Sequence, residues 1–173
     1  MKENYFNIPN FLTILRILFS PVFFVLFIIG NDLLALIIFI AVALTDVVDG
    51  WVARTTNQKT RFGKFIDPMA DKFMIFLALA ALILRYGFPL WAIPLILSRD
   101  IISLCGSLLI HLKKRGVWKA NKFGKLTTLL QIVVIVAYVL DFYKIVFLWI
   151  AIVFSLITAV SYVHRGINIL MKD

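Results

Sequence analysis

The segment from Asp46 to Asp71 reads D-V-V-D-G-W-V-A-R, then eight further residues, then G-K-F-I-D-P-M-A-D. It contains four aspartates within or at the edges of strongly apolar segments: Asp46, Asp49, Asp67 and Asp71. An ionised carboxylate at membrane depth costs on the order of 3 kcal/mol or more, so such residues are rare outside functional sites. Four of them in one short segment indicate a site that binds divalent metal and, with it, a phosphorylated substrate at a membrane surface.

The composition of the whole chain is that of an integral membrane protein. Hydrophobic residues make up 62% of the 173 residues, and the mean hydropathy is +1.00, well above the usual values of soluble domains. Apolar runs long enough to cross a bilayer recur along the chain. They predict an all-α fold with six transmembrane helices, at residues 11–29, 33–53, 63–84, 89–112, 125–140 and 144–164. Pro94 is expected to kink the fourth of these helices.

The distribution of basic residues predicts the topology. The net charge is +9, and most of the lysines and arginines lie in the two longer connections and at the termini. The opposite side of the predicted helices has only Arg85 and Lys144. By the positive-inside rule, both termini and both basic connections face the cytoplasm of a bacterial cell membrane, and anionic lipid rather than nucleic acid explains the charge.

No repeat or linker divides the chain. Residues 1–173 are therefore expected to form one membrane domain, in which residues 1–10 are a candidate interfacial segment.

The spacing of the four aspartates predicts that they converge. Asp46 and Asp49 are three residues apart and Asp67 and Asp71 are four apart, so each pair shares one face of a helix. The end of the second predicted helix and the start of the third lie on the same cytoplasmic side. Four carboxylates brought together would repel one another strongly unless cations bind. Oxygen ligands suit Mg²⁺ or Mn²⁺, and two such ions could hold a diphosphate between them.

The same segment resembles the signature of the CDP-alcohol phosphatidyltransferase family, D-x2-D-G-x2-A-R-x8-G-x3-D-x3-D, and each of its fixed positions is matched. The resemblance implies a homodimeric membrane enzyme with six helices. It also implies transfer of a phosphate-linked group from a CDP-linked lipid to an alcohol, with release of CMP. The active site would face the cytoplasm and hold two divalent cations.

The resemblance also implies roles for individual residues. The four aspartates would bind the metal ions, and Asp71 would in addition be the general base toward the acceptor hydroxyl. Arg54 would hold the diphosphate. The residues implied to contact the CDP group are Thr13, Asp49, Gly50, Ala53, Arg54, Gly63 and Asp67.

The start of the chain concerns the acceptor. Residues 7–16, N-I-P-N-F-L-T-I-L-R, resemble the P-N-x-L-T-x-x-R opening of bacterial family members that use sn-glycerol 3-phosphate. The implied reaction joins CDP-diacylglycerol and glycerol 3-phosphate, giving phosphatidylglycerol phosphate and CMP in phospholipid biosynthesis. An anionic acceptor requires cations, and the candidates are Arg99, Lys119, Lys122, Lys125 and Arg165. Each of these candidates has an alternative to acceptor binding. The lysines would then act only as topology signals, and Arg99 would only pair internally with Asp100.

Three rival interpretations remain. The first is the same reaction with another acceptor, namely serine, inositol phosphate or phosphatidylglycerol. The second is a divalent-cation transporter, although acids clustered near one membrane surface do not mark a path across it. The third is a membrane protein without catalysis, which has no use for the glycine, alanine and arginine interleaved with the aspartates.

Overall fold

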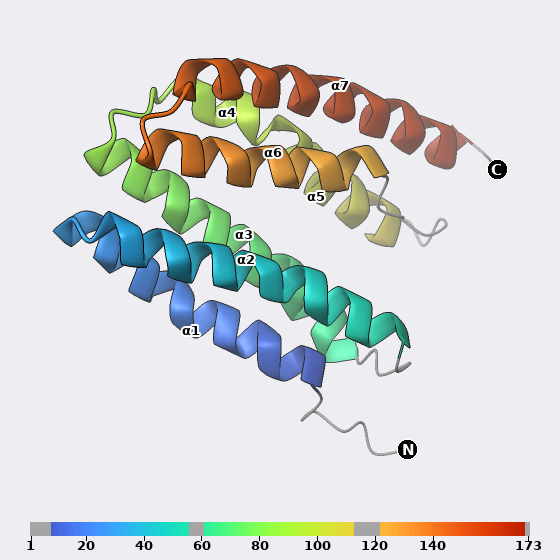
Figure 1. Ribbon diagram of the computed structural model, residues 1–173. Helices are drawn as coiled ribbons and strands as arrows, with labels where there is room; N and C mark the ends of the chain where they lie inside the picture. The colour runs from blue at the N-terminus through green and yellow to red at the C-terminus, as the bar shows by residue number, and fades with distance from the viewer. Residues whose placement is uncertain (1–7, 56–60, 113–121, 172–173) are drawn as a thin grey trace. The chain divides into compact units, whose positions relative to one another are not determined.

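The computed structural model describes the backbone of residues 8–55, 61–112 and 122–171, and the side chains of residues 11–45, 69–106 and 123–167. Every regular element in these ranges is a helix, which confirms the all-α prediction. The helices are α1 (Ile8–Ile29), α2 (Asp32–Thr55), α3 (Arg61–Arg85), α4 (Ala92–Ile96), α5 (Ser98–Leu112), α6 (Lys122–Val139) and α7 (Lys144–Met171) (Figure 1). They form two compact units, Met1–Phe88 and Pro89–Asp173, which are described separately as unit 1 and unit 2.

In unit 1, α1 is the shared partner of the other two helices, and it packs against both α2 and α3 (Figure 1). Aromatic rings form much of this contact. Phe23 is fully buried, and the centroid of its ring lies 5.3 Å from that of Phe39 on α2 and 6.0 Å from that of Phe27 on α1 itself, both in edge-to-face arrangements. Such rings interlock in few ways, so they fix how α1 and α2 lie against each other.

One end of unit 1 is fastened by Arg85, the last residue of α3. Its Nη1 donates to the carbonyl oxygen of Phe27 at 2.9 Å and so supplies a donor to the C-terminal end of α1. Its Nη2 lies 3.6 Å from the carboxylate of Asp32, which also accepts a 2.6 Å hydrogen bond from the Tyr86 hydroxyl. The turn needs glycine at Gly30, where φ is +92° and an added Cβ would lie 2.7 Å from Nη1 of Arg85.

In unit 2, α7 is the shared partner, and it packs against α4, α5 and α6 (Figure 1). The helix predicted at residues 89–112 is divided: α4 ends at Ile96 and α5 begins at Ser98. Pro94 lies inside α4 and cannot donate a backbone hydrogen bond. Three residues later the helix is interrupted at Leu97 alone, which keeps helical dihedral angles and donates to the Ile93 carbonyl oxygen at 3.0 Å. The carbonyl oxygen of Ile96 accepts hydrogen bonds from Gln131 Nε2 at 3.0 Å and Ser155 Oγ at 2.9 Å. Side chains from α6 and α7 thus satisfy the backbone at the break.

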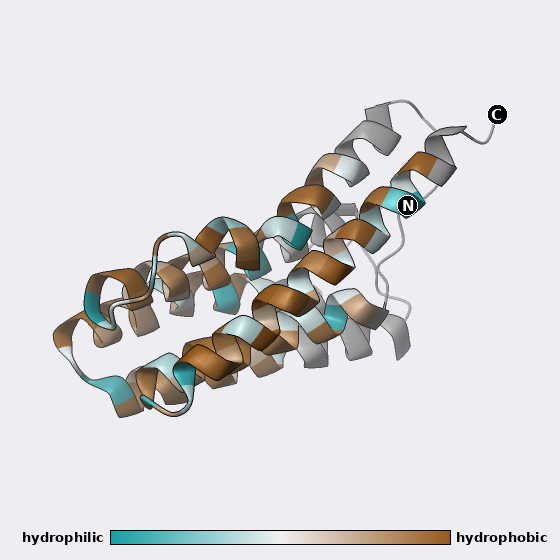
Figure 2. Ribbon diagram, turned by 90° about the horizontal axis from the view of Figure 1, so that it is seen from above, coloured by the Kyte–Doolittle hydropathy of each residue, from teal (hydrophilic) through white to brown (hydrophobic). Residues whose placement is uncertain are grey.

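Some of the described helices have membrane character. Within the described residues, Phe11–Ile29 and Lys144–Ile167 are long and apolar enough to cross a bilayer, and Asp32–Thr45 and Phe123–Val139 are shorter apolar segments. Hydrophobic residues dominate along the helices in Figure 2. The full set of six spans, the cytoplasmic termini and the dimer stay predictions.

Candidate functional site

The four aspartates of the signature lie on two helices of unit 1. Asp46 and Asp49 belong to the C-terminal half of α2, and Asp67 and Asp71 belong to the N-terminal half of α3. Both segments are helical, so each pair shares a helix face as expected. Asp71 is half-buried. The side chains of the other metal and CDP candidates on α2 and α3 lie outside the described residues, and these are Asp46, Asp49, Gly50, Ala53, Arg54, Gly63 and Asp67.

The donor set fits divalent cations. Carboxylate oxygens are hard ligands, and ligand pairs at helical spacing come from two helices that both pack on α1. Mg²⁺ and Mn²⁺ typically take such ligands and keep positions for water and phosphate oxygens. Asp46, Asp49, Asp67 and Asp71 are therefore the residues that would hold them.

One face of α1 is polar and buried. Thr13 is 1% exposed, and Arg16 and Ser20 are fully buried. These residues are three and four positions apart, so they line one side of the helix. Thr13 was predicted to contact the CDP group, and its burial places it in the interior of unit 1. The sequence pattern that contains Arg16 did not predict a role for this residue. An arginine in the middle of an apolar helix is the signal that could have identified it.

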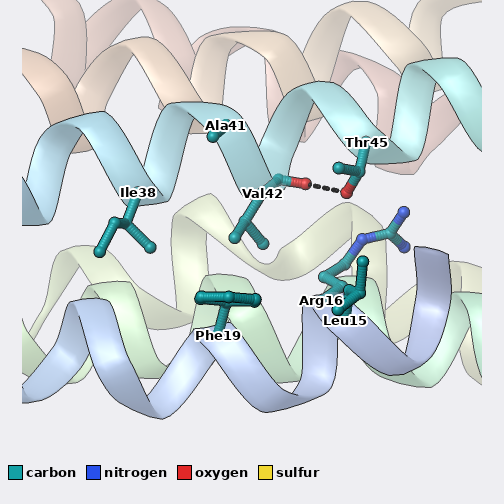
Figure 3. Close-up of a pocket in the computed structure, with 7 residues that line it drawn as sticks. All are labelled: Leu15, Arg16, Phe19, Ile38, Ala41, Val42 and Thr45. Atoms are coloured by element: carbon teal, nitrogen blue, oxygen red, sulfur yellow. Dashed lines mark hydrogen bonds between the residues drawn. The ribbon is translucent and has the colours of Figure 1, made fainter. Parts of the chain in front are cut away.

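A groove of about 200 Å³ lies between α1 and α2 (Figure 3). It is lined by Leu15, Arg16, Phe19, Ile38, Ala41, Val42 and Thr45. Figure 3 shows the guanidinium of Arg16 at the end where Thr45 lies. Thr45 directly precedes Asp46, and its hydroxyl donates to the Val42 carbonyl oxygen at 2.6 Å. The apolar groove of unit 1 therefore ends where the aspartate segment begins.

Unit 2 contains a buried polar cluster, formed by side chains from α5, α6 and α7: Ser98, Arg99, Asp100, Thr127, Thr128, Gln131, Ser155 and Thr158. At its centre, Arg99 Nη1 donates to Asp100 Oδ1 at 2.7 Å and to Thr128 Oγ1 at 3.2 Å. Gln131 Nε2 donates to the other Asp100 oxygen at 2.7 Å. The internal pair of Arg99 and Asp100, considered above as an alternative to substrate contact, is therefore formed.

The five cationic candidates for the acceptor phosphate differ in their surroundings. Only 11% of the Arg99 side chain is exposed, and it belongs to the polar cluster. Lys125 and Arg165 are exposed. Lys119 and the side chain of Lys122 lie outside the described residues. Sequence reasoning identified Arg99, but it missed Gly124, Thr128 and Tyr162, which lie next to it, and Gln131, which contacts its partner Asp100. The sequence feature that could have indicated these residues is a single polar residue within an apolar helix.

Comparisons with known proteins agree with the aspartate signature. Residues 6–157 match the family model described as CDP-alcohol phosphatidyltransferase. A Bacillus subtilis protein named CDP-diacylglycerol–glycerol-3-phosphate 3-phosphatidyltransferase is 33% identical over 93% of this chain and 95% of its own. A Mycobacterium tuberculosis protein named probable phosphatidylglycerophosphate synthase is 35% identical over 94% of this chain and 82% of its own. An Aquifex aeolicus protein with the first of these names is 31% identical over 96% of this chain and 99% of its own. With this coverage and the complete signature at residues 46–71, the chain belongs to the CDP-alcohol phosphatidyltransferase family.

Proposed function

We propose that this protein transfers the phosphatidyl group of CDP-diacylglycerol to sn-glycerol 3-phosphate, giving phosphatidylglycerol phosphate and CMP. One observation carries the proposal: relatives named for this reaction match the chain over nearly its whole length at 31% to 35% identity. The complete aspartate signature supports the same chemistry. The protein is therefore a transferase of phospholipid biosynthesis.

The reaction balances with the residues assigned by the family resemblance. The acceptor hydroxyl oxygen forms a bond to the phosphorus that carries diacylglycerol. The bond from that phosphorus to the oxygen of the cytidine-bearing phosphate breaks, and CMP leaves with the electron pair. The carboxylate of Asp71 takes the proton of the attacking hydroxyl. Arg54 holds the diphosphate with charge-assisted hydrogen bonds.

Divalent cations complete this site. When bound by the aspartates, they neutralise the diphosphate and stabilise the negative charge that develops on the phosphoryl oxygens. Gly50, Ala53 and Gly63 leave room for the cytidine, because small side chains allow close approach to the backbone. Thr13 borders the same group. We expect the site to face the cytoplasm in a bacterial cell membrane, because the basic connections are predicted on that side, and we expect the protein to act as a homodimer.

A phosphate-bearing acceptor is favoured by Arg99. It is a largely buried cation within unit 2, and Asp100 and Thr128 engage only its Nη1 atom. Serine is a zwitterion whose carboxylate stands beside an ammonium group, so it brings less net negative charge to such a cation than a phosphate monoester does. Lys119, Lys122, Lys125 and Arg165 remain further candidates to attract or bind the acceptor.

The decisive experiment is an acceptor screen with purified protein in mixed micelles containing CDP-diacylglycerol. Glycerol 3-phosphate, serine, inositol phosphate and phosphatidylglycerol are supplied separately, and CMP release is followed. We expect CMP only with glycerol 3-phosphate, loss of the activity on chelation, and recovery with Mg²⁺ or Mn²⁺. Release with serine alone would overturn the acceptor assignment. Metal-ion flux into liposomes without any CMP release would favour the transporter.

A further inference from the structure

The guanidinium of Arg99 presents one edge that the polar cluster leaves unused. Its Nη1 atom makes both hydrogen bonds of the head group, to Asp100 and to Thr128. The Nε–H group is buried and meets no acceptor within the part of the chain that the structure describes. A buried donor without an acceptor is costly, which indicates that a ligand supplies the acceptor.

The unused edge has the geometry of an anion-binding fork. In a guanidinium group, Nε and Nη2 point their N–H bonds side by side, and together they match two oxygens of one phosphate. The engaged atom, Nη1, lies on the other side of the group. The polar cluster thus orients Arg99 so that its side-on edge is the one left available.

Two other features hold the head group in place. The ring of Tyr162 lies 5.8 Å from the guanidinium carbon, in cation–π contact. Asp100, which holds Nη1, is itself fixed by Gln131, and Gln131 is anchored to the Ile96 carbonyl oxygen at the break between α4 and α5. The position of Arg99 therefore depends on residues that need not touch any substrate.

Gly124 of α6 supplies the space for this arrangement. A Cβ atom added at Gly124 would lie 2.5 Å from Nη2 of Arg99 and 2.7 Å from the Tyr162 hydroxyl oxygen. Both are far ends of side chains, so they could move without moving the helix. A methyl group at Gly124 would displace the Nε/Nη2 edge and leave the backbone of α6 in place.

We propose that Gly124, with Asp100 and Gln131, positions the Nε/Nη2 edge of Arg99 as a side-on fork for the phosphate group of the acceptor. This inference rests on the proposed function, which supplies a phosphate monoester as acceptor. Arg99 binds the phosphate, whereas Gly124, Asp100 and Gln131 are positioning residues.

The test compares Gly124→Ala with Arg99→Lys and with the double variant. Lysine keeps the charge of residue 99 but lacks the planar fork. For each single variant we expect the KM for glycerol 3-phosphate to rise about tenfold or more, the order expected for lost hydrogen bonds to a charged group. The KM for CDP-diacylglycerol should stay unchanged. In the Arg99→Lys background, Gly124→Ala should have little further effect, because the fork it displaces is already absent.

The controls separate positioning from folding. Alanine has a higher helix propensity than glycine, so the thermal midpoint of Gly124→Ala should not fall. Gly106→Ala adds the same methyl group to a glycine of α5 and should leave both KM values unchanged. The inference is overturned by an unchanged acceptor KM in Gly124→Ala, by a rise confined to the donor KM, or by additive effects in the double variant. Wild-type protein that releases no CMP with glycerol 3-phosphate would instead refute the proposed function, and this inference with it.

Discussion

The helices within unit 1 are held together by a different kind of contact from the helices within unit 2. In unit 1, α1 meets its neighbours largely through aromatic and aliphatic side chains, with Phe23, Phe27 and Phe39 fully buried. In unit 2, hydrogen bonds link α5, α6 and α7 through a buried network that includes Asp100 and Gln131. An apolar contact tolerates the loss of one member better than a buried network, in which each lost partner leaves a polar group unsatisfied. Unit 1 also buries Thr13, Arg16 and Ser20 on one face of α1. The aspartate signature therefore lies in a unit that combines an apolar helix contact with a buried polar helix face.

The largest effect is expected from Asp71→Asn in unit 1. Loss of the proposed general base should lower the rate of CMP release about 10²- to 10⁴-fold. The thermal midpoint should change little, because the replacement has nearly the same size. Asp141→Asn is the matched control, since Asp141 lies in a turn at φ +52°, a conformation that asparagine also adopts. Equal activity in the two variants would contradict the role of Asp71 as general base, and with it the assignment of the chemical step to unit 1.

Gln131→Met in unit 2 should show the opposite pattern. Methionine keeps the approximate volume but gives no hydrogen bond to Asp100 Oδ2 or to the Ile96 carbonyl oxygen, which keeps its bond from Ser155. The lost hydrogen bond to the charged group should cost about 1.5–3 kcal/mol. We expect a thermal midpoint several degrees lower, with a smaller relative loss in the maximal rate than in Asp71→Asn. Leu129→Met, at an exposed position of the same helix, is the control. If Gln131→Met were as stable as the control, the network would not be what holds unit 2 together.

Arg85→Met should have a smaller effect. It removes the hydrogen bond to the Phe27 carbonyl oxygen and the ion pair with Asp32. The Arg85 side chain is 34% exposed, so water can replace part of what is lost, and we expect a cost of about 1 kcal/mol or less. Turnover should be unchanged. Lys144→Met, which breaks an ion pair at an exposed loop of unit 2, should shift the thermal midpoint still less. A large loss of activity in Arg85→Met would mean that this end of unit 1 takes part in the reaction.

The smallest expected effect concerns Tyr86 at high pH. Burial, and then the hydrogen bond to Asp32, raise the pKa of Tyr86 above its usual value. In the unfolded chain a tyrosine ionises near about pH 10. Above that pH the unfolded state binds fewer protons than the folded state, so stability falls as the pH rises. The contribution is complete below about pH 10. Tyr86→Phe should show a weaker decline of the thermal midpoint between about pH 9 and pH 11 than wild type, and identical declines would contradict the assignment.

The sequence predicted most of the helices because each apolar run is long and bounded by charged or turn residues. The expected helix at residues 11–29 corresponds to α1, and that at 144–164 corresponds to α7, which continues to Met171. The division at Leu97 was not predicted. Pro94 cannot donate to the carbonyl oxygen of Leu90. The interruption at Leu97 instead involves the carbonyl oxygen of Ile96, and its donors, Gln131 and Ser155, lie far along the chain.

The candidate site shows the same contrast. The aspartate signature could be recognised because all its residues lie within Asp46–Asp71, where helical spacing alone places them on shared faces. The surroundings of Arg99 could not be recognised in the sequence, because Gly124, Thr128 and Tyr162 come from two other helices. Their importance depends on contacts that only the packing of α5, α6 and α7 creates. In the sequence, a glycine at position 124 indicates only a weakened helix. In the structure, it leaves the space that the guanidinium of Arg99 occupies.

The carbonyl oxygen of Ile96 affects how unit 2 would insert into a membrane during synthesis. During synthesis, α4 and α5 emerge before Gln131 and Ser155, the two side chains that donate to this oxygen. In the core of a bilayer, no water is present to donate a hydrogen bond to an exposed carbonyl oxygen at a helix interruption. We therefore expect the segment from Pro89 to Leu112 to enter the lipid together with the two helices that follow it, as one insertion event rather than helix by helix.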